Sequence, residues 1–351
     1  MKRKIVGIFI VMLLIGTVLP VSGRIMFSDI NKPLLIDDNL LASDNTELEW
    51  MIAGKGLRCI RFYQIHVPTG YDGSEPVPLV VALHGSTGTG RYFNPAHIIW
   101  FYKDTFFENY TDFSEKADIE NFIVVYPKAL LFYSPEFMFH LFAYNVPVYP
   151  DSWYKGRNLI DDIGFIDDLI DKIQSEYNIN SDMVYLAGLS NGADMVYSLG
   201  CLLSNKISAI SVIAGEIAKK DKDDEEFSYP PDPENPMPVI VFHGTGDTSV
   251  PWEGDEWGCG VDPSIQFWVE QNSCNPDPEI FESESGKIIR YIYSNGLDGS
   301  EVVLYKSVNG THCWPGNDFE SVPGAPWLVD QIKEIDATDL IWEFFESHPK
   351  Q

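Results

Sequence analysis

Ser190 lies in the pentapeptide Gly-Leu-Ser-Asn-Gly at residues 188–192, which matches the pattern G-x-S-x-G. Where this pattern joins a strand to a helix, the tight turn lifts the serine hydroxyl above the sheet, and the glycines remove side chains that would clash. A serine held in this way can attack a carbonyl carbon and become acylated, provided that a base takes its proton. The same pattern also occurs in tight turns that need glycine but have no catalytic role. Partner residues therefore decide whether Ser190 is a nucleophile or part of such a turn.

Asp247 is the acid best placed to partner this serine. The chain order must be serine, acid, histidine when the nucleophile sits in a G-x-S-x-G turn. The apolar run at 239–242 predicts a buried strand, and His-Gly-Thr-Gly-Asp follows it directly at 243–247. An aspartate in such a loop can hydrogen-bond a histidine and fix its tautomer. Asp255 and Asp262 are alternatives, but they lie farther from the strand end.

His312 is the histidine that the sequence favours as the base. It follows the last strand-like segment, in the turn-rich sequence Gly-Thr-His-Cys-Trp-Pro-Gly at 310–316. His84 and His243 each precede a glycine at a strand end, where a structural hydrogen-bonding role is the simpler interpretation. The other four histidines precede the serine or lie near the C-terminus, and they are His66, His97, His140 and His348.

Two backbone N–H groups are needed to stabilise the negative oxygen that forms when a serine attacks a carbonyl. In this arrangement one donor follows the nucleophile, and the other lies in the loop after an early strand. We therefore expect the first donor from Asn191 and the second from Ser86, which follows His-Gly at 84–85.

The elements that must position these residues alternate along the chain. Continuous apolar runs predict strands that are covered on both faces, and segments with helical periodicity separate several of the runs. This alternation predicts a mostly parallel sheet with helices on both faces, whose sites lie at the carboxyl ends of the strands. The expected strands are 59–67, 78–83, 122–126, 183–187, 207–214, 239–242, 290–293 and 302–305, and the expected helices are 160–177, 193–203, 265–271 and 338–346.

The N-terminus predicts an export signal. Residues 2–4 are basic, residues 5–19 are mostly apolar, and small residues follow Pro20. That order is typical of a cleaved signal peptide, and the apolar run is short for a membrane span of about 20 residues. We therefore expect a signal peptide at 1–23, a leader segment at 24–55, one catalytic domain at 56–351, and secretion. A retained N-terminal membrane anchor is the alternative.

The composition limits the partners of the chain. With 52 acidic and 24 basic residues, the formal net charge is −28. Nucleic acid and anionic membranes attract basic surfaces, so neither is expected as a partner. The sequons at Asn109 and Asn309 are too short to predict glycosylation, and no pattern in the sequence sets an oligomeric state.

The chain resembles the α/β-hydrolase esterases grouped as polyhydroxybutyrate depolymerases and feruloyl esterases, the carbohydrate esterase family 1 group. The shared segments run in order over most of residues 56–345. They are LVVALHG (79–85), DDIGF (161–165), GLSNGA (188–193), HGTGD (243–247), VP (250–251) and HCWPG (312–316). The resemblance implies an α/β-hydrolase fold and the hydrolysis of a carboxylic ester by an exported enzyme. It also implies that no metal or other cofactor takes part.

The resemblance further implies a disulfide between Cys274 and Cys313, which would hold the His312 loop in register. Two independent buried thiols are the alternative. An odd count of five cysteines leaves at least one unpaired within the chain. Cys201 is expected to be a thiol in the core, and the sequence does not decide the state of Cys59 or Cys259.

Several features bear on the substrate. Trp252 and Trp314 are neighbours of the expected acid and base, so they are candidates for the wall of the cleft. The aromatic-rich stretches at 92–113 and 130–153 fit either a substrate rim or ordinary packing. Feruloyl, acetyl, polyhydroxybutyrate and synthetic polyester substrates remain open. A serine peptidase of the same fold and a non-catalytic binding module are the competing interpretations.

Overall fold

The computed structural model describes residues 46–53, 59–85, 106–129, 161–218, 230–255, 258–317 and 329–350. These residues fall within one compact unit that spans 42–351. The strands are β1 (Thr46–Ala53), β2 (Cys59–His66), β3 (Val77–Leu83), β4 (Ile123–Lys128), β5 (Ile179–Leu189), β6 (Ala209–Ile213), β7 (Val239–Gly244), β8 (Glu279–Glu282), β9 (Ile288–Tyr293) and β10 (Val302–Ser307). The helices are α3 (Phe106–Thr111), α4 (Phe113–Glu120), α5 (Asp162–Glu176), α6 (Asn191–Leu202), α7 (Val261–Gln271), the short 3-10 turn η2 (Leu297–Gly299) and α8 (Ala337–Ser347).

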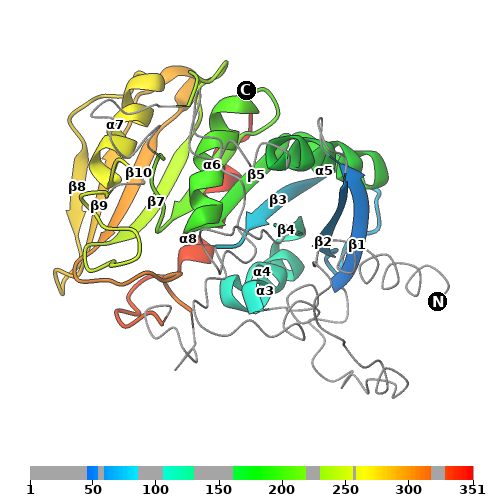
Figure 1. Ribbon diagram of the computed structural model, residues 1–351, viewed down its shortest axis with the longest axis horizontal. Helices are drawn as coiled ribbons and strands as arrows, with labels where there is room; N and C mark the ends of the chain where they lie inside the picture. The colour runs from blue at the N-terminus through cyan, green and yellow to red at the C-terminus, as the bar shows by residue number, and fades with distance from the viewer. Residues whose placement is uncertain are drawn as a thin grey trace, which may run out of the picture. The chain divides into compact units, whose positions relative to one another are not determined.

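A ten-stranded sheet in the order β1-β2-β4-β3-β5-β6-β7-β10-β9-β8 forms the centre of this unit (Figure 1). The six strands from β4 to β10 in this order are parallel. Antiparallel pairs extend the sheet at both edges, with β1 and β2 on one side and β9 and β8 on the other. The expected mostly parallel sheet is confirmed.

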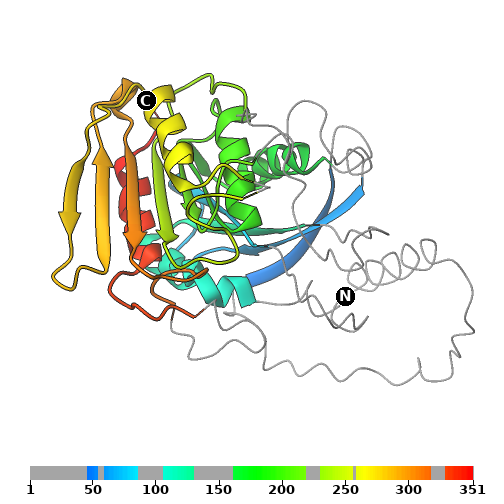
Figure 2. The ribbon, with the colours of Figure 1, turned by 60° about the vertical axis from the view of Figure 1, so that its left-hand side comes forward.

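Helices cover both faces of the sheet, as Figures 1 and 2 show. One core cluster joins α5, α6 and α7 to the first face, and a second joins α3, α4 and α8 to the opposite face. The strand β3 contributes alternately to the two, with Leu79 and Val81 in the first cluster and Val80 and Ala82 in the second. An apolar side chain is therefore needed at every position, which explains why this strand is a continuous apolar run.

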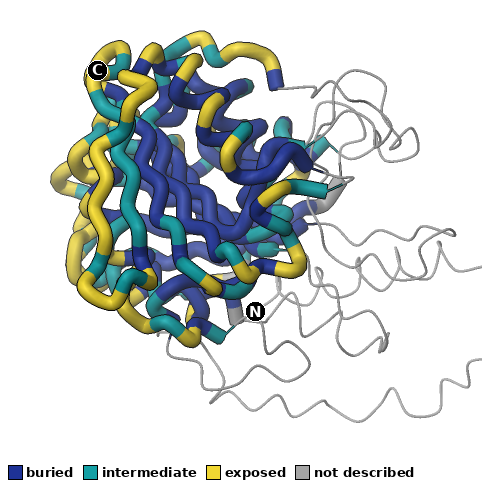
Figure 3. The backbone as a smooth tube through the Cα atoms, turned by 90° about the vertical axis from the view of Figure 1, so that its left-hand side faces the viewer, coloured by how far each residue is buried: buried dark blue, intermediate teal, exposed yellow. Residues whose placement is uncertain are grey.

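The sheet begins inside the segment that the sequence assigned to a leader. Residues 46–53 form β1, which pairs with β2 from Thr46 opposite His66 to Ala53 opposite Cys59. At the other edge every residue of β8 is exposed, whereas the central strands are buried (Figure 3). Within the part of the chain that the structure describes, no helix is long and apolar enough to cross a membrane.

Candidate active site

Ser190 occupies the turn between β5, which ends at Leu189, and α6, which begins at Asn191. Its backbone has φ 56° and ψ −126°, a region that costs a residue with a side chain about 1–3 kcal/mol. The Ser190 N–H donates to the carbonyl oxygen of Ile213 at 2.9 Å, which ties the turn to the end of β6. The turn is therefore strained and held in place by the neighbouring strand.

The two glycines of the pentapeptide allow this turn to form. A Cβ atom on Gly188 would lie 2.5 Å from the carbonyl oxygen of Gly192, and one on Gly192 would lie 2.4 Å from that of Leu83. Both distances are shorter than any normal contact with backbone. The close approach of α6 to β5 and β3 thus requires glycine at both positions.

The end of β3 lies directly against the serine. A Cβ atom on Gly85 would be 3.1 Å from Ser190 Cβ and 3.7 Å from Ser190 Oγ. Asn191, the first expected oxyanion donor, is the first residue of α6, where backbone N–H groups face out of the helix start. Ser86, the second expected donor, lies outside the described residues.

Asp247 and His312 meet in the interior. His312 Nδ1 and Asp247 Oδ2 are 2.7 Å apart, and the two residues are 6% and 5% exposed. The other carboxylate oxygen, Oδ1, accepts the N–H groups of Ser249 at 2.8 Å and Val250 at 2.9 Å. The loop that follows β7 therefore fixes the carboxylate, and the carboxylate fixes the imidazole.

The electrostatics of Asp247 favour its charged form. Burial alone would raise the pKa of this carboxyl group. The hydrogen bond and positive charge of His312, together with the N–H of Val250, outweigh burial and hold the pKa of Asp247 below its ordinary value. A carboxylate in this state can stabilise an imidazolium as it forms.

His243 is hydrogen-bonded to the loop that follows β7 and carries Asp247. Its Nε2 donates to the carbonyl oxygen of Val250 at 2.9 Å, and its ring is fully buried. Burial is the main cause that lowers the pKa of His243, so the ring stays neutral. The structural role that the sequence suggested for His243 agrees with these contacts.

The sheet brings the three candidate residues to one edge. Ser190 follows β5, Asp247 follows β7, and His312 follows β10, and all three strands are parallel within one sheet. Their carboxyl ends share the edge at which α/β proteins bind ligands. Among the residues described, no three His, Cys, Asp or Glu side chains are placed to hold a metal ion.

Trp314 does not line a cleft, and this part of the sequence analysis is wrong. The residue is 1% exposed. Its backbone N–H donates to Tyr110 Oη at 3.1 Å, and its indole Nε1 donates to Thr338 Oγ1 at 2.9 Å. The rings of Phe107 and Phe113 meet it edge-on. Trp314 therefore anchors the His312 loop to α3 and α8 instead of contacting substrate.

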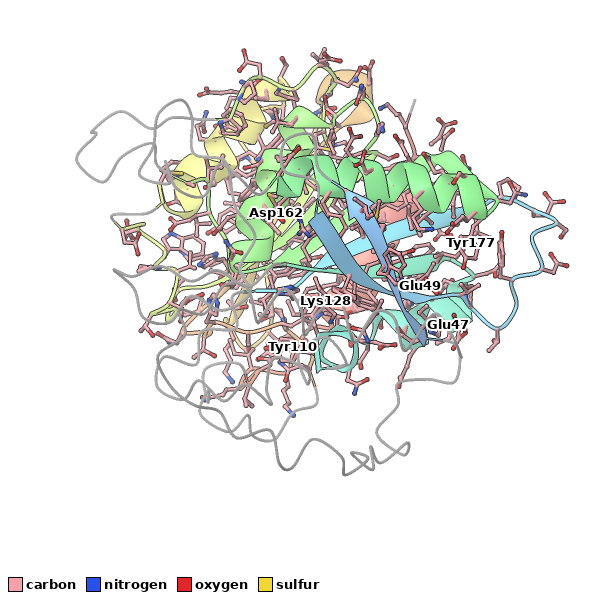
Figure 4. The ribbon with its side chains drawn as sticks, turned by 45° about the vertical axis from the view of Figure 1, so that its right-hand side comes forward. Glu47, Glu49, Tyr110, Lys128, Asp162 and Tyr177 are labelled. Carbon is pink, nitrogen blue, oxygen red and sulfur yellow. The ribbon has the colours of Figure 1, made fainter. Side chains whose placement is uncertain are left out.

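Sequence reasoning missed Tyr110 and Thr338 as residues that support the site. Tyr110, which is labelled in Figure 4, lies in a sequon and in the aromatic-rich stretch at 92–113, and Thr338 begins an expected helix, but neither position indicated a hydrogen bond to the His312 loop. Both are buried polar residues, a state that usually requires a hydrogen-bond partner. Their burial, however, is visible only in the structure.

Trp252 is 9% exposed and lies beside the acid loop. Its ring meets His243 edge-on, and Lys306 Nζ lies 4.5 Å from the ring centre. Its indole N–H donates to Asp262 at 3.4 Å. A contact between Trp252 and substrate stays a prediction.

The expected disulfide is also wrong, because Cys274 and Cys313 are both free thiols. Cys274 Sγ lies 3.8 Å from the carbonyl oxygen of Ser300, just before β10. Cys313 borders a hollow with Gly244 and Ser307, at the other end of that strand. The six residues of β10 span roughly 20 Å, whereas a disulfide requires Cα atoms about 4.4–6.8 Å apart.

Comparisons with known proteins agree with this fold. No family model matches the chain. Feruloyl esterase C of Emericella nidulans is 27% identical over 287 residues, which cover 81% of this chain and 83% of that protein. A probable feruloyl esterase C of Aspergillus niger is 27% identical over 191 residues, and the chain spans 57% of the length of that relative.

A solved structure, the acetyl xylan esterase from Aspergillus awamori, matches with a TM-score of 0.53 at 16% identity. The match covers 76% of this chain and 94% of that one. At this identity the likeness shows the fold alone, which is that of the α/β-hydrolases. The chain thus has the α/β-hydrolase fold and is similar in sequence to proteins named feruloyl esterase.

Proposed function

We propose that the chain hydrolyses carboxylic esters through an acyl-enzyme on Ser190, with His312 as the base and Asp247 as the partner of the base. The observation that carries this proposal is the buried hydrogen bond between His312 Nδ1 and Asp247 Oδ2. A carboxylate on Nδ1 leaves Nε2 as the nitrogen that can take a proton. Ser190, which lies in the strained turn at the same edge of the sheet, carries the hydroxyl group that would donate this proton.

The reaction proceeds in two halves. Ser190 Oγ attacks the ester carbonyl carbon while His312 Nε2 takes the hydroxyl proton, and the resulting oxyanion accepts N–H groups from Asn191 and the loop after β3. The tetrahedral intermediate then breaks its bond to the alcohol oxygen, which receives the proton from His312. A water molecule attacks the acyl-enzyme in the same way and releases the carboxylic acid.

The substrates that we propose are feruloyl or acetyl esters of plant polysaccharide. Support comes from the relatives named feruloyl esterase and from one named a bifunctional acetylxylan esterase/xylanase, which is 25% identical over 185 residues. A polyhydroxyalkanoate-type polyester is the second candidate ester. We further propose that the protein is secreted, on the basis of the signal-like order of residues 1–23.

Ser190→Ala tests the function. We expect hydrolysis of nitrophenyl acetate and of methyl ferulate to fall at least about 10³-fold, because loss of the nucleophile leaves only binding and oxyanion stabilisation. Ser198→Ala is a matched control, since Ser198 lies on α6 and its hydroxyl donates to the backbone carbonyl oxygen of Asp194 at 3.4 Å. Initial rates measured side by side give the comparison.

Retention of activity by the Ser190→Ala protein would remove the proposal. An aryl-peptide amide, acetylated xylan and polyhydroxybutyrate complete the substrate panel. Faster cleavage of the amide than of any ester would favour a peptidase. A wild-type protein that binds these compounds but cleaves none of them would indicate a binding module.

A further inference from the structure

Glu216 is a buried acidic residue that the reaction scheme above does not use. It lies just after β6, on the edge of the sheet that carries Ser190, and it is 5% exposed. Its Oε2 accepts the backbone N–H of Gly260 at 2.6 Å. Hydrogen bonds to an ionised carboxylate are roughly twice as strong as those between neutral groups, so this contact is a firm tie between two segments of the chain.

The backbone of Glu216 is fixed on the helix that follows the nucleophile. Its N–H donates to Asp194 Oδ1 at 3.0 Å, and the N–H of Asp194 donates to the carbonyl oxygen of Ser190 at 3.0 Å. A Cβ atom on Gly215 would lie 2.4 Å from Ala193 Cβ. The segment after β6 therefore lies directly against the first turn of α6.

The carboxyl groups of Asp194 and Glu216 would repel each other if both were charged. Burial raises the pKa of Asp194 well above its ordinary value, against the hydrogen bond from the N–H of Glu216. The negative charges of Glu216 and Asp255 act in the same direction as burial. The neutral form of Asp194 is therefore favoured, and this form does not repel the Glu216 carboxylate.

The side chain of Glu216 packs on the backbone of Gly258. A Cβ atom on Gly258 would lie 1.8 Å from Glu216 Cδ, so the carboxyl group occupies the space that a side chain at 258 would fill. Two backbone contacts join the same segments. Cys259 N–H donates to the carbonyl oxygen of Ile217 at 3.0 Å, and Gly258 forms an antiparallel bridge with Ala218.

Residues 258–260 form the far end of the loop that carries Asp247. The next residue, Val261, donates its N–H to the carbonyl oxygen of Trp252 at 2.9 Å. The Trp252 ring meets His243 edge-on, and His243 is hydrogen-bonded to the carbonyl of Val250. The N–H of Val250 donates to Asp247 Oδ1 at 2.9 Å. The loop thus returns on itself, and a shift at its far end is transmitted to the carboxylate of Asp247.

We infer that Glu216 is a positioning residue, which fixes the Asp247 loop relative to the helix after Ser190 through its hydrogen bond to Gly260. This inference rests on the proposed ester hydrolysis. The base must lie between its acid partner and the nucleophile, and these two residues follow different strands of the sheet. A misplacement of about 1 Å, caused by a change far from the reacting atoms, can lower the rate about 10²-fold.

Three variants test the inference, with a fourth as control. Glu216→Ala removes the carboxylate, whereas Glu216→Gln keeps an amide oxygen that can accept the N–H of Gly260. Gly258→Ala retains Glu216 but places a Cβ atom where its carboxyl group lies. Ser204→Ala is the matched control, because Ser204 is 2% exposed and its Oγ accepts the N–H of Glu234 at 2.9 Å, in the loop before β7.

We expect Glu216→Ala and Gly258→Ala to lower kcat for nitrophenyl acetate by about 10- to 100-fold, because both release the far end of the Asp247 loop. Glu216→Gln should lose less than Glu216→Ala. Ser204→Ala should keep the kcat of the wild type even where its melting temperature falls, since it frees a buried N–H at the other end of β7.

The same variants in an Asp247→Asn background separate positioning from a general loss of structure. Residues that act through one another have non-additive effects. In this background Glu216→Ala should therefore lower kcat by less than about threefold, because the acid that it positions has already been replaced. A general structural loss would repeat in full. Ser190→Ala protein, prepared in the same way, gives the background rate.

A wild-type kcat in folded Glu216→Ala would overturn the inference, and so would a full repeat of its loss in the Asp247→Asn background. A Glu216→Gln protein no more active than Glu216→Ala would refute the role of the hydrogen bond to Gly260. Where Glu216→Ala does not fold, as judged by thermal unfolding, Gly258→Ala decides by the same two measurements. A wild-type protein that hydrolyses no ester contradicts the proposed function instead, so the two failures are distinguishable.

Discussion

At the scale of single residues, Asp247 divides its two carboxylate oxygens between two tasks. Oδ1 accepts two backbone N–H groups, and Oδ2 meets His312. Because each oxygen is engaged, the carboxylate cannot rotate without breaking several bonds. The imidazole is consequently held in one orientation with Nε2 directed away from the acid.

Asp247→Asn should lower kcat by roughly 10³–10⁴-fold, because an amide can favour the wrong tautomer of the base. Steady-state kinetics with nitrophenyl acetate measure the effect. Asp255→Asn is the control, since Asp255 was the nearest alternative acid and its carboxylate contacts the N–H of Gly258 at 3.3 Å. A larger loss in the Asp255 variant than in the Asp247 variant would show that the acid has been misassigned.

The pKa of Asp247 predicts how the free energy of unfolding changes in acid. A group whose folded-state pKa is depressed contributes stability above its unfolded pKa, near 3.9 by reference values, and loses it as pH falls through the folded value. The pKa of Asp247 is depressed, mainly by His312 against the opposing effect of burial. Unfolding by urea should therefore show a smaller difference between wild type and Asp247→Asn at about pH 3 than at about pH 7. If the difference in stability between wild type and Asp247→Asn is the same at both pH values, the pKa of Asp247 is not depressed in the folded protein.

The residues of the site differ in how far the sequence could reveal them. Ser190, Asp247 and His312 follow strand ends in the order that such a site requires, so the local pattern was enough to propose them, and their catalytic roles stay predictions. Trp314 was misjudged because its hydrogen-bond partners, Tyr110 and Thr338, come from distant segments. Proximity in sequence to a functional residue does not show whether a side chain faces the cleft or the core.

At the scale of elements, the buried pair of Arg61 and Asp162 joins β2 to the first residue of α5. Arg61 is 1% exposed, and its guanidinium lies 3.9 Å from the ring centre of Phe165. Such a pair adds little stability over an apolar pair. Removal of one partner, however, leaves a buried charge without compensation.

Asp162→Asn should therefore lower the free energy of unfolding by about 3–5 kcal/mol. Urea unfolding followed by fluorescence measures this change. Asp171→Asn, on the same helix, breaks an ion pair with Lys206 in which the aspartate is 60% exposed, so it should cost at most about 1 kcal/mol. If the two variants are equally stable, the pair at Arg61 is not the tie between β2 and α5 that its burial indicates.

The elements that the sequence predicted well are those buried on both faces. A strand such as β3 is a continuous apolar run because both core clusters need its side chains. Edge strands lack that signal. In β1, Trp50 and Ile52 are 44% and 51% exposed, and the strand was expected to be part of a leader. The helices α3 and α4 lie in and beside an aromatic-rich stretch whose apolar residues show no clear helical period.

At the scale of the whole molecule, no disulfide joins the four cysteines whose side chains the structure describes. Cys201, Cys259, Cys274 and Cys313 are buried free thiols, and burial is the main cause that raises the pKa of each. We expect all four to be alkylated when the unreduced protein is denatured. Mass spectrometry of the digest checks this, and a cross-linked peptide that contains Cys274 and Cys313 would contradict it.

The net charge of −28 predicts how the stability of the molecule responds to salt. Like charges over one compact unit repel each other, and folding brings them together, so repulsion lowers the free energy of unfolding. The Debye length falls from about 30 Å at 0.01 M salt to about 3 Å at 1 M, so salt screens this repulsion. Salt also weakens attractive pairs, but exposed ones such as Lys172 with Glu176 contribute only about 0–1 kcal/mol each.

Repulsion should therefore dominate the balance, and the melting temperature should rise between about 0.01 M and 0.5 M sodium chloride at neutral pH. Differential scanning fluorimetry measures the shift. The same series near pH 4.4, the isoelectric point from the sequence, is the control, because the net charge is close to zero there and the rise should shrink. A melting temperature that falls with sodium chloride at neutral pH would mean that attractive pairs, and not the excess of carboxylates, set the electrostatic stability of this fold.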